Sequence, residues 1–251
     1  MQTIEITNSG KYERHYKYLK DAKLPIPPIE VQEQIVAECL AVDNEYNTAQ
    51  ETIQTAKQNI RGVFDNLQTS GIGKSRLSQL CYYSTERTSI IEAATYITTD
   101  NMLQNCEGIS EYTGTTNIPS AVAYKKGDVL VSNIRPYLQK IWYADRDGAC
   151  SPDVLVFRVN NDDILSKFLY YSMKRKTFFD YIMNQAGVNG IKMPRGNKDA
   201  TMNFEVVVPS IADQQQIIAQ VEQYEAAIRQ AQAIMDGCAA RKKTILDKHL
   251  N

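Results

Sequence analysis

The side chains best suited to chemistry lie in one basic stretch, residues 174–198. Six basic residues there face a single acidic one, Asp180, and four side-chain amides lie among them. These ten residues are Lys174, Arg175, Lys176, Asn184, Gln185, Asn189, Lys192, Arg195, Asn197 and Lys198. Lys and Arg suit phosphate oxygens, while Arg, Asn and Gln can also bind base edges in the major groove. The stretch therefore indicates a nucleic-acid-binding surface, with an ordinary solvated loop as the alternative.

A second basic segment, Gly71-Ile72-Gly73-Lys74-Ser75, resembles the end of a phosphate-binding loop. Position 68, where such a loop needs its first glycine, is Gln68, and the segment follows a predicted helix rather than a strand. We interpret the glycines as the end of that helix. A flexible segment after it would leave Lys74 and Arg76 available to phosphates.

The sequence contains no catalytic or metal-binding constellation. An adenine methyltransferase needs an Asn/Asp-Pro-Pro-aromatic motif, and the only Pro-Pro pair follows Ile26. The five cysteines form no Cys-x-x-Cys pair, and the two histidines, His15 and His249, are far apart in the sequence. We therefore predict no catalytic residue, no metal site and no cofactor bound by this chain.

The near-neutral charge conceals a difference between segments. The 251 residues include 28 basic and 29 acidic ones, a net charge of −1. Residues 29–68 contain seven acidic and two basic residues, whereas residues 69–209 contain sixteen basic and fourteen acidic ones. Because nucleic-acid binding depends on local clustering of positive charge, the total charge does not exclude it.

No segment of the sequence favours a membrane. No run approaches the ~20 apolar residues that a spanning helix needs, and the polar N-terminus is unlike a signal peptide. We expect a cytoplasmic protein with reduced thiols, in which Cys39 and Cys238 are packed on helices.

An internal repeat organises the chain. Residues 27–38 (PPIEVQEQIVAE) and 209–220 (PSIADQQQIIAQ) match at a constant offset of 182 positions. Each copy starts with a proline, which suits the start of a helix, and continues into a long polar segment without proline. The repeat therefore predicts two long helices, over residues 27–68 and 209–251.

Both predicted helices carry apolar residues at alternating spacings of three and four. The first stripe runs from Ile35 to Leu67, and the second runs from Ile217 to Cys238 before Lys242 interrupts it. Such a narrow stripe needs a partner helix, and each helix is a candidate for the other, within one chain or between chains. A generic coiled coil with no specific role is the alternative. The expected helix–helix interface consists of Ile35, Val42, Tyr46, Ile53, Ile60, Val63, Ile217, Val221, Tyr224, Ile228 and Met235.

The segment between the helices, residues 69–208, has the pattern of a mixed globular domain. Short apolar runs at 121–124, 128–131, 140–143 and 154–157 predict strands separated by turn residues, and a helical spacing covers about residues 164–184. The predicted fold class is α+β: one globular mixed α/β domain flanked by two long helices that form an antiparallel coiled coil.

These features together resemble the specificity subunit of type I restriction-modification systems. The resemblance rests on the two proline–glutamine helix starts, the paired long helices and a central run. That run extends from Gly127-Asp128-Val129-Leu130 through Arg135-Pro136-Tyr137-Leu138 to Cys150-Ser151-Pro152-Asp153, and is similar to the signature of the family's target recognition domains. In that family two recognition domains each read one half of a bipartite DNA sequence, and the long helices hold them apart and bind methyltransferase subunits.

Only one complete recognition domain is present, over residues 69–208. Residues 1–26 resemble the vestigial tail of another, because Leu24-Pro25-Ile26-Pro27 corresponds to Val206-Val207-Val208-Pro209. The resemblance thus implies a non-enzymatic half-subunit that binds double-stranded DNA. Its implied partners are a DNA adenine methyltransferase subunit and a restriction/translocase subunit, which would hold S-adenosylmethionine and ATP. Since a half-subunit reads one half-site, we expect a homodimer held by the helices on a palindromic, interrupted target.

The expected base contacts come from the loops around Asn133–Arg135 and Asn189–Lys198. The full predicted DNA-binding set is Lys74, Arg76, Asn133, Arg135, Lys140, Lys174, Asn189, Lys192, Arg195, Asn197 and Lys198. Tyr137 and Trp142 are interpreted as packing residues. The alternative function is that of a coiled-coil assembly protein, or of a truncated remnant, without sequence-specific DNA binding.

Overall fold

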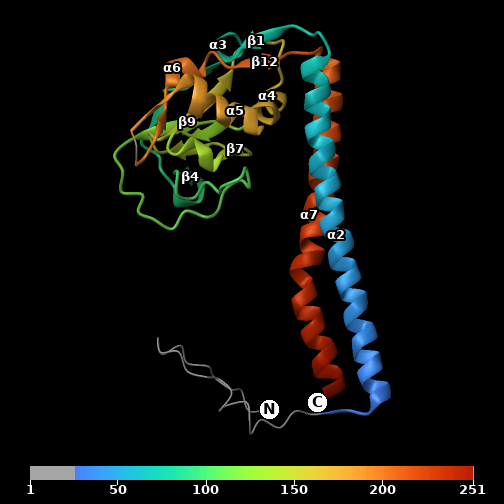
Figure 1. Cartoon of the computed structure of the whole chain (residues 1–251). Coiled ribbons are helices and arrows are strands. Elements are labelled where there is room, and N and C mark those ends of the chain that lie inside the picture. The colour runs from blue at the N-terminus through green and yellow to red at the C-terminus, as the bar shows by residue number, and fades with distance from the viewer. Residues whose placement is uncertain (1–25, 191, 251) are drawn as a thin grey trace. The chain divides into compact units, whose positions relative to one another are not determined.

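The structure, a computed structural model, describes residues 26–190 and 192–250, which fall into two compact units. The globular unit comprises residues 53–229, and the helical unit comprises the described parts of residues 1–52 and 230–251. Two long helices contribute to both units: α2 spans Ile29–Thr69 and α7 spans Ile211–Leu250 (Figure 1). The tail predicted over residues 1–26 lies outside the described residues except for Ile26.

Two four-stranded sheets form the centre of the globular unit (Figure 1). One has the strand order β2-β9-β6-β7, the other has the order β3-β5-β8-β4, and β1-β12 and β10-β11 are separate pairs. The strands are β1 (Lys74–Arg76), β2 (Cys81–Tyr83), β3 (Arg87–Thr88), β4 (Tyr96–Ile97), β5 (Ala121–Tyr124), β6 (Val129–Ser132), β7 (Ile141–Tyr143), β8 (Gly148–Cys150), β9 (Val154–Val159), β10 (Val188–Asn189), β11 (Arg195–Gly196) and β12 (Glu205–Val207). The four predicted runs are confirmed as β5, β6, β7 and β9.

Short helices and turns connect these strands. They are α3 (Leu77–Leu80), η1 (Ala93–Thr95), η2 (Pro136–Leu138), α4 (Ser166–Met173), α5 (Lys176–Tyr181), the π-type turn η3 (Ile182–Ala186) and α6 (Lys198–Thr201). The helical stretch predicted over about 164–184 is confirmed but divided, because Arg175 is extended (φ −73°, ψ 145°) between α4 and α5. The α+β fold class is confirmed.

Strand β6 carries three consecutive apolar residues, Val129 to Val131, because both of its faces are covered. Val129 and Val131 point to one side, into a core that also contains Phe157 and helix α4. Leu130 points to the other side and packs with Trp142 in a second core. This alternation is the period of two expected of a strand, and it places a layer of side chains on each face of the sheet.

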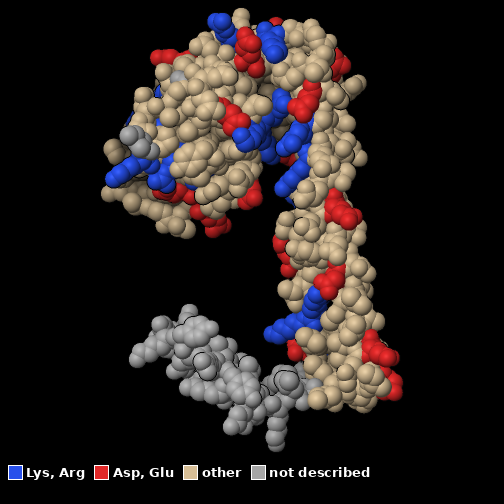
Figure 2. All heavy atoms as spheres, viewed as in Figure 1, with Lys and Arg blue, Asp and Glu red and all other residues tan. Residues whose placement is uncertain are grey.

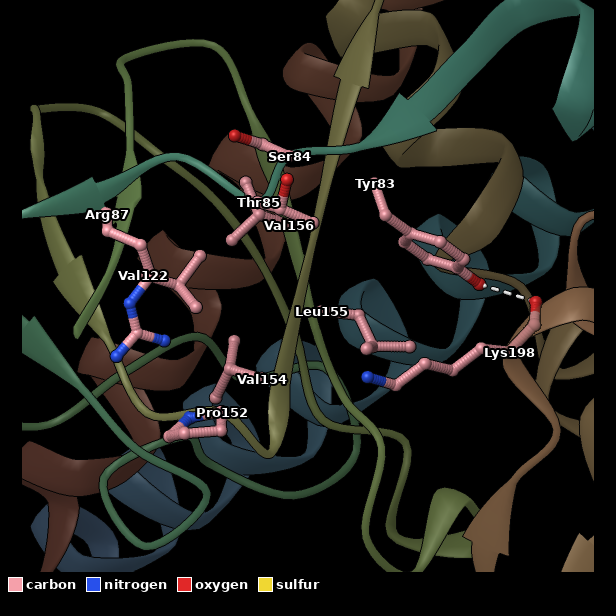
Figure 3. Close-up of a pocket in the computed structure, with 10 residues that line it drawn as sticks. All are labelled: Tyr83, Ser84, Thr85, Arg87, Val122, Pro152, Val154, Leu155, Val156 and Lys198. Atoms are coloured by element: carbon pink, nitrogen blue, oxygen red, sulfur yellow. Dashed lines mark hydrogen bonds between the residues drawn. The ribbon is translucent and has the colours of Figure 1, made fainter.

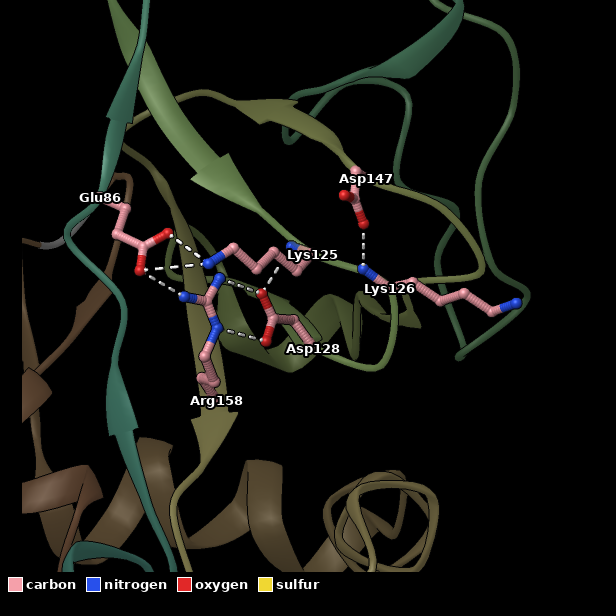
Figure 4. A network of polar contacts seen from close by, with 6 residues as sticks. All are labelled: Glu86, Lys125, Lys126, Asp128, Asp147 and Arg158. Atoms are coloured by element: carbon pink, nitrogen blue, oxygen red, sulfur yellow. Dashed lines mark hydrogen bonds and ion pairs between the residues drawn. The ribbon is translucent and has the colours of Figure 1, made fainter.

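A polar network links residues that border the two sheets. The Arg158 guanidinium on β9 lies between two carboxylates (Figure 4): it donates to both oxygens of Asp128 at 2.9 and 2.7 Å and pairs with Glu86 at 2.9 Å. Lys125 also pairs with Glu86, at 3.1 Å. Asp128 is almost fully buried, and its hydrogen bonds with Arg158 raise the pKa of the guanidinium further. A buried carboxylate held in this way fixes the turn that leads into β6.

In the helical unit the two helices pair antiparallel along the predicted stripes. Val42, Ala49 and Cys238 are buried, and Cys39, Ile35 and Met235 are half-buried. Tyr46 is less covered than the other predicted residues of this unit, with 38% of its surface exposed. The stripe on α7 continues through Lys242 and His249, where charge replaces apolar contact: Lys242 pairs with Asp43 at 2.5 Å, and His249 and Lys248 bind Glu38 at 3.0 and 3.1 Å. At the polar end of the predicted stripe, ion pairs between side chains therefore join the two helices.

In the globular unit the same helices join the main core. Phe64, Leu67 and Val221 are buried there, while Ile60 and Ile217 are half-buried against them. The other predicted interface residues of this unit, Ile53, Val63, Tyr224 and Ile228, are also half-buried. No helix in the described parts of the chain is long and apolar enough to cross a bilayer.

The repeated glutamine serves both helix starts in the same way. Gln32 Nε2 donates to Pro27 O at 2.8 Å, and Gln214 Nε2 donates to Pro209 O at 2.9 Å. These bonds satisfy a carbonyl that the helix itself cannot reach, so each proline–glutamine pair fixes the approach of the chain to its helix. The duplicated motif thus holds the chain at the start of each long helix.

Only the second glutamine also binds the globular domain. Gln214 is fully buried; it donates to Asp163 O at 2.7 Å and accepts from Leu165 N at 2.8 Å. Gln32 is half-buried, and its side chain has no further hydrogen-bond partner within the described residues. The two copies of the repeat are therefore alike in sequence and unequal in what they contact.

The exit from α2 corrects one expectation. Gly71 has the positive φ (76°) typical of a residue just beyond a helix end, as predicted. Lys74 and Arg76, however, do not lie in a flexible segment. They lie on β1, which pairs antiparallel with β12 in the register Lys74 with Val207 and Arg76 with Glu205.

Candidate nucleic-acid interface

Backbone hydrogen bonds join the turn after β6 to the β10–β11 hairpin. Arg135 N donates to Pro194 O at 2.7 Å, and Gly196 N donates to Asn133 O at 3.2 Å. Ile134 and Arg195 also form an isolated β-bridge. The two loops, which the sequence places sixty residues apart, therefore form one continuous piece of backbone pairing.

Close packing at Gly196 explains why the hairpin can approach so near. A Cβ atom at this position would lie 2.8 Å from Ile182 Cγ2 and 3.0 Å from Asn133 Oδ1. The first distance is too short for real carbon contacts, so a larger residue would have to displace the side chain of Ile182 in η3 and crowd that of Asn133 in the turn. Glycine at this position thus keeps the two loops together.

The turn itself has an unusual backbone at both ends of η2. Arg135 and Gln139 have left-handed conformations, with φ of 49° and 52°. Such conformations cost about 1 kcal/mol or more for residues with a side chain and persist where the surroundings enforce them. Here Pro136 is buried between them while Arg135 and Tyr137 are exposed. The packing interpretation holds for the buried Trp142, but for Tyr137 it is wrong.

An acidic residue that the sequence did not single out restrains Arg195. Arg195 Nη1 donates to Asp153 Oδ1 at 2.6 Å, and the two side chains are 52% and 32% exposed. Asp153 lies just before β9, and its carbonyl accepts from Asn133 N at 2.8 Å. The sequence feature that points to Asp153 is its place at the end of the run from Cys150 to Asp153.

Two of the predicted DNA contacts, Asn133 and Asn197, have structural roles within the protein. Asn133 is only 8% exposed and contributes its backbone to the turn–hairpin pairing. Asn197 is the N-cap of α6, and its Oδ1 accepts from Ala200 N at 3.1 Å. A side chain engaged in capping is not free to read a base without giving up that bond.

Two predicted cations are likewise held by the protein. Lys140 Nζ donates to Thr99 O at 2.5 Å, and burial lowers the pKa of this half-buried amine. Lys174 Nζ pairs with Glu225 at 2.5 Å and lies 5.5 Å from the centre of the Tyr170 ring. The Lys174 ammonium is therefore engaged in an internal contact with helix α7.

The remaining predicted residues all have exposed side chains. They are Lys74, Arg76, Arg135, Asn189, Lys192, Arg195 and Lys198. Arg135, Asn189, Lys192 and Arg195 lie on the joined turn and hairpin, whereas Lys74 and Arg76 belong to β1. The chain thus offers one coherent group of four polar side chains and separate cations on other elements.

A pocket of about 290 Å³ lies beside this group. Val122, Val154 and Leu155 form its apolar wall, and Arg87 and Lys198 lie on opposite sides of that wall (Figure 3). Tyr83 Oη donates to the Lys198 carbonyl at 2.9 Å, which attaches the start of α6 to β2. Pro152 and Val154, which flank Asp153, belong to the same lining.

The family model for the type I restriction modification DNA specificity domain matches residues 73–234, more than half of the chain. The chain belongs to this family. The matched region contains every residue of the predicted DNA-binding set and excludes α2.

Known relatives of this specificity domain agree with the assignment. The specificity subunit of the type I restriction enzyme EcoDI from Escherichia coli is 33% identical over 97 residues, which cover 39% of this chain and 21% of that subunit. The S subunit of a type I system from M. genitalium has a similar fold, with a TM-score of 0.54, 10% identity, and coverage of 89% of this chain and 62% of that one. A chain from a structural study of complex assembly and conformational transition in a type I system gives a TM-score of 0.52, 16% identity, and coverage of 90% and 60%. The chain therefore spans about three fifths of the length of these solved relatives.

The surface of the specificity domain carries mixed charge. On the face shown in Figure 2, Lys and Arg side chains are interspersed with Asp and Glu rather than gathered in one field. Within residues 26–190 and 192–250, no group of three or more His, Cys, Asp or Glu side chains is arranged to hold a metal ion. Binding of a polyanion must therefore depend on local groups of cations.

Proposed function

We propose that this chain is the DNA-recognition component of a type I restriction-modification complex, and that it reads one half of a bipartite target in double-stranded DNA. In this proposal residues 69–208 form the recognition domain, and residues 27–68 and 209–251 form the helical regions. The observation that carries the proposal is the joined turn and hairpin, which presents Arg135, Asn189, Lys192 and Arg195 together in a chain of the DNA specificity family.

The exposed residues divide by chemistry into two roles. Arg195 and Arg135 have the forked donors that suit the O6 and N7 atoms of guanine, and Asn189 suits adenine. Lys74, Arg76, Lys192 and Lys198 suit phosphate oxygens, which fix the register of the protein on the duplex. The apolar pocket next to Lys198 is suited to contact with a thymine methyl group.

We assign the protein partners to the helices. Ile29, Val36 and Leu40 form an apolar ridge on α2, and each is between 55% and 59% exposed. The positions that correspond on α7 are Ile211, Ile218 and Glu222, of which Ile218 packs against the core and Glu222 pairs with Lys167. A face that is covered in one copy of the repeat and bare in the other supports docking of another protein on α2.

In this proposal the chain is non-enzymatic and holds no cofactor. The helices dock a DNA adenine methyltransferase subunit, which carries S-adenosylmethionine, and the assembly recruits an ATP-dependent restriction/translocase subunit. Two copies of the chain associate through the helices, and a two-fold dimer recognises a palindromic, interrupted sequence.

Selection from a duplex library with a randomised window tests this function. The purified full chain should enrich a defined sequence, with binding that weakens as salt rises. Arg195→Ala should relax the preference at one base pair, at a cost of about 1–3 kcal/mol for that pair. Lys74→Ala should weaken binding to all sequences and reduce the salt slope by about one.

Two further outcomes would contradict the proposal. Enrichment of no sequence, together with salt-independent association, would favour an assembly protein without specific DNA binding. A strict monomer by light scattering at micromolar concentration would exclude the homodimer and leave half-site recognition to be completed by a different chain.

A further inference from the structure

Asp153 lies where it can control how Arg195 meets DNA. Its carboxylate accepts from Arg195 Nη1 at 2.6 Å, and it has no other side-chain bond to the described parts of the chain. An acidic side chain within a DNA-binding surface repels phosphate, so its presence there requires a compensating role. We infer that Asp153 is a positioning residue that sets the base specificity of Arg195; this inference rests on the proposed function.

The backbone around both residues is fixed, which makes such positioning effective. Asp153 O accepts from Asn133 N at 2.8 Å, and Val154 N donates to Ser151 O at 3.0 Å at the start of β9. Arg195 lies on β11 and forms a bridge with Ile134. The hydrogen bond therefore links two side chains whose backbones are already held by the same turn, and it restrains the remaining freedom of the long arginine.

The geometry of the pair leaves the reading edge of Arg195 open. A guanidinium has five N–H donors, and Asp153 occupies one on Nη1. The edge formed by Nε and Nη2 can still make the two parallel bonds that guanine accepts. A restrained arginine loses less rotamer freedom on binding than a free one. This strengthens the bidentate contact to the correct base, which needs one geometry, more than it strengthens contacts to phosphate, which accept many.

Asp153 should weaken binding to DNA of any sequence by repelling phosphate, and it should favour the correct base by positioning Arg195. Removing the charge with Asp153→Asn should increase the affinity of the full chain for non-target duplex, because one repulsion of phosphate is lost. The same variant should lower discrimination at the base pair read by Arg195 by about 3- to 10-fold, a part of the roughly 5- to 150-fold expected for a complete bidentate contact.

Selection from the randomised duplex library, followed by titration of the enriched and one mismatched duplex, measures both effects. Asp162→Asn is the matched control, because Asp162 is exposed and its side chain makes no hydrogen bond or ion pair to the described residues. Asp162→Asn should leave discrimination unchanged. In the Arg195→Ala background, Asp153→Asn should have no further effect on discrimination, since the role passes through Arg195. Thermal denaturation checks that each variant is folded.

Three results separate the possible failures. If Asp153→Asn weakens binding to every duplex equally, or if it reduces discrimination equally with and without Arg195, the residue is merely structural and the inference is overturned. If Arg195→Ala relaxes the preference and Asp153→Asn leaves it intact, positioning by Asp153 is overturned while the proposed function stands. If the wild-type chain enriches no sequence, the proposed function fails and the inference fails with it.

Discussion

Replacing the glutamine of each repeat copy by leucine should reveal the difference between the two helix starts. Gln214 makes three hydrogen bonds in a fully buried position, to Pro209 O, Asp163 O and Leu165 N. Gln32 occupies the same place in the first copy, but it is half-buried and its side chain donates only to Pro27 O among the described residues. The two substitutions are the same change of side chain at equivalent positions.

The expected costs follow from the groups left unpaired. Gln214→Leu removes the acceptor of Leu165 N at the start of α4 and the donor to Asp163 O. A buried group without a partner costs about 1–3 kcal/mol, so the free energy of unfolding of the globular unit should fall by about 2–4 kcal/mol. For a unit of this size, a loss of 3 kcal/mol lowers Tm by about 6–12 °C. Gln32→Leu removes one partly exposed bond and should cost about 1 kcal/mol in the helical unit.

Thermal denaturation followed by circular dichroism, with urea denaturation of the same proteins, measures both changes. Gln216→Leu is the control, since Gln216 is exposed in the first turns of α7 and should change stability by about 0.5 kcal/mol or less. The reasoning holds that the bonds of Gln214 to Asp163 O and Leu165 N stabilise the chain more than its bond to Pro209 O does. A smaller loss in the free energy of unfolding for Gln214→Leu than for Gln32→Leu would refute it.

Three further predictions concern other parts of the chain. Arg158→Met should lower the stability of the globular unit in urea by about 3–5 kcal/mol, because it leaves the carboxylate of Asp128 buried without its main partner; Arg146→Met, at an exposed pair, should cost about 1 kcal/mol or less. Burial raises the pKa of Cys81 and Cys150 to about 12, so both stay protonated at pH 8 and should react with a thiol reagent only after unfolding; rapid labelling of either in the folded chain would contradict this. Hydrogen bonds from His249 and Lys248 hold the pKa of Glu38 in the folded chain below its usual value of 4.5. The ionised Glu38 therefore stabilises the helix pair fully above pH 4.5, and this stabilisation is lost as the pH falls through the lowered pKa of the folded chain. Glu38→Gln should remove this part of the acid dependence of the helical circular dichroism signal, and Glu33→Gln should preserve it.

The features that could be predicted from the sequence are those with a long or repeated pattern. The three-four stripes and the duplicated proline–glutamine starts predicted both long helices to within a few residues. The runs that became β5, β6, β7 and β9 have enough apolar residues to be recognised as strands. The remaining strands are two or three residues long and are held by pairing with distant segments, as β1 is by β12, so no local pattern reveals them.

The residues predicted to bind DNA could not be sorted from the sequence alone, because residue type does not reveal what a side chain already binds within the protein. Lys174 and Lys176 are neighbours in one basic run, yet Lys174 pairs with Glu225 on α7 while Lys176 pairs with Asp180 on its own helix. Asn189 and Asn197 are the same residue type in the same basic stretch, but of the two only Asn197 caps a helix. Asp153 is absent from the predicted set for the converse reason: an acidic residue is not expected in a surface that binds phosphate, and its contact with Arg195 joins positions 42 residues apart.

The construction of the interface permits its specificity to change without loss of the fold. The turn and the hairpin are joined through main-chain atoms of Asn133, Arg135, Pro194 and Gly196. Since these bonds do not depend on the side chains of Asn189, Lys192 or Arg195, which are exposed, substitutions there should alter stability by only about 0.5 kcal/mol. Gly196, by contrast, cannot be enlarged without displacing the side chains of Ile182 and Asn133, which pack against it. Under the proposed function, base preference can therefore vary at the exposed positions while the main-chain pairing, the buried Asn133 and the glycine keep those positions in place.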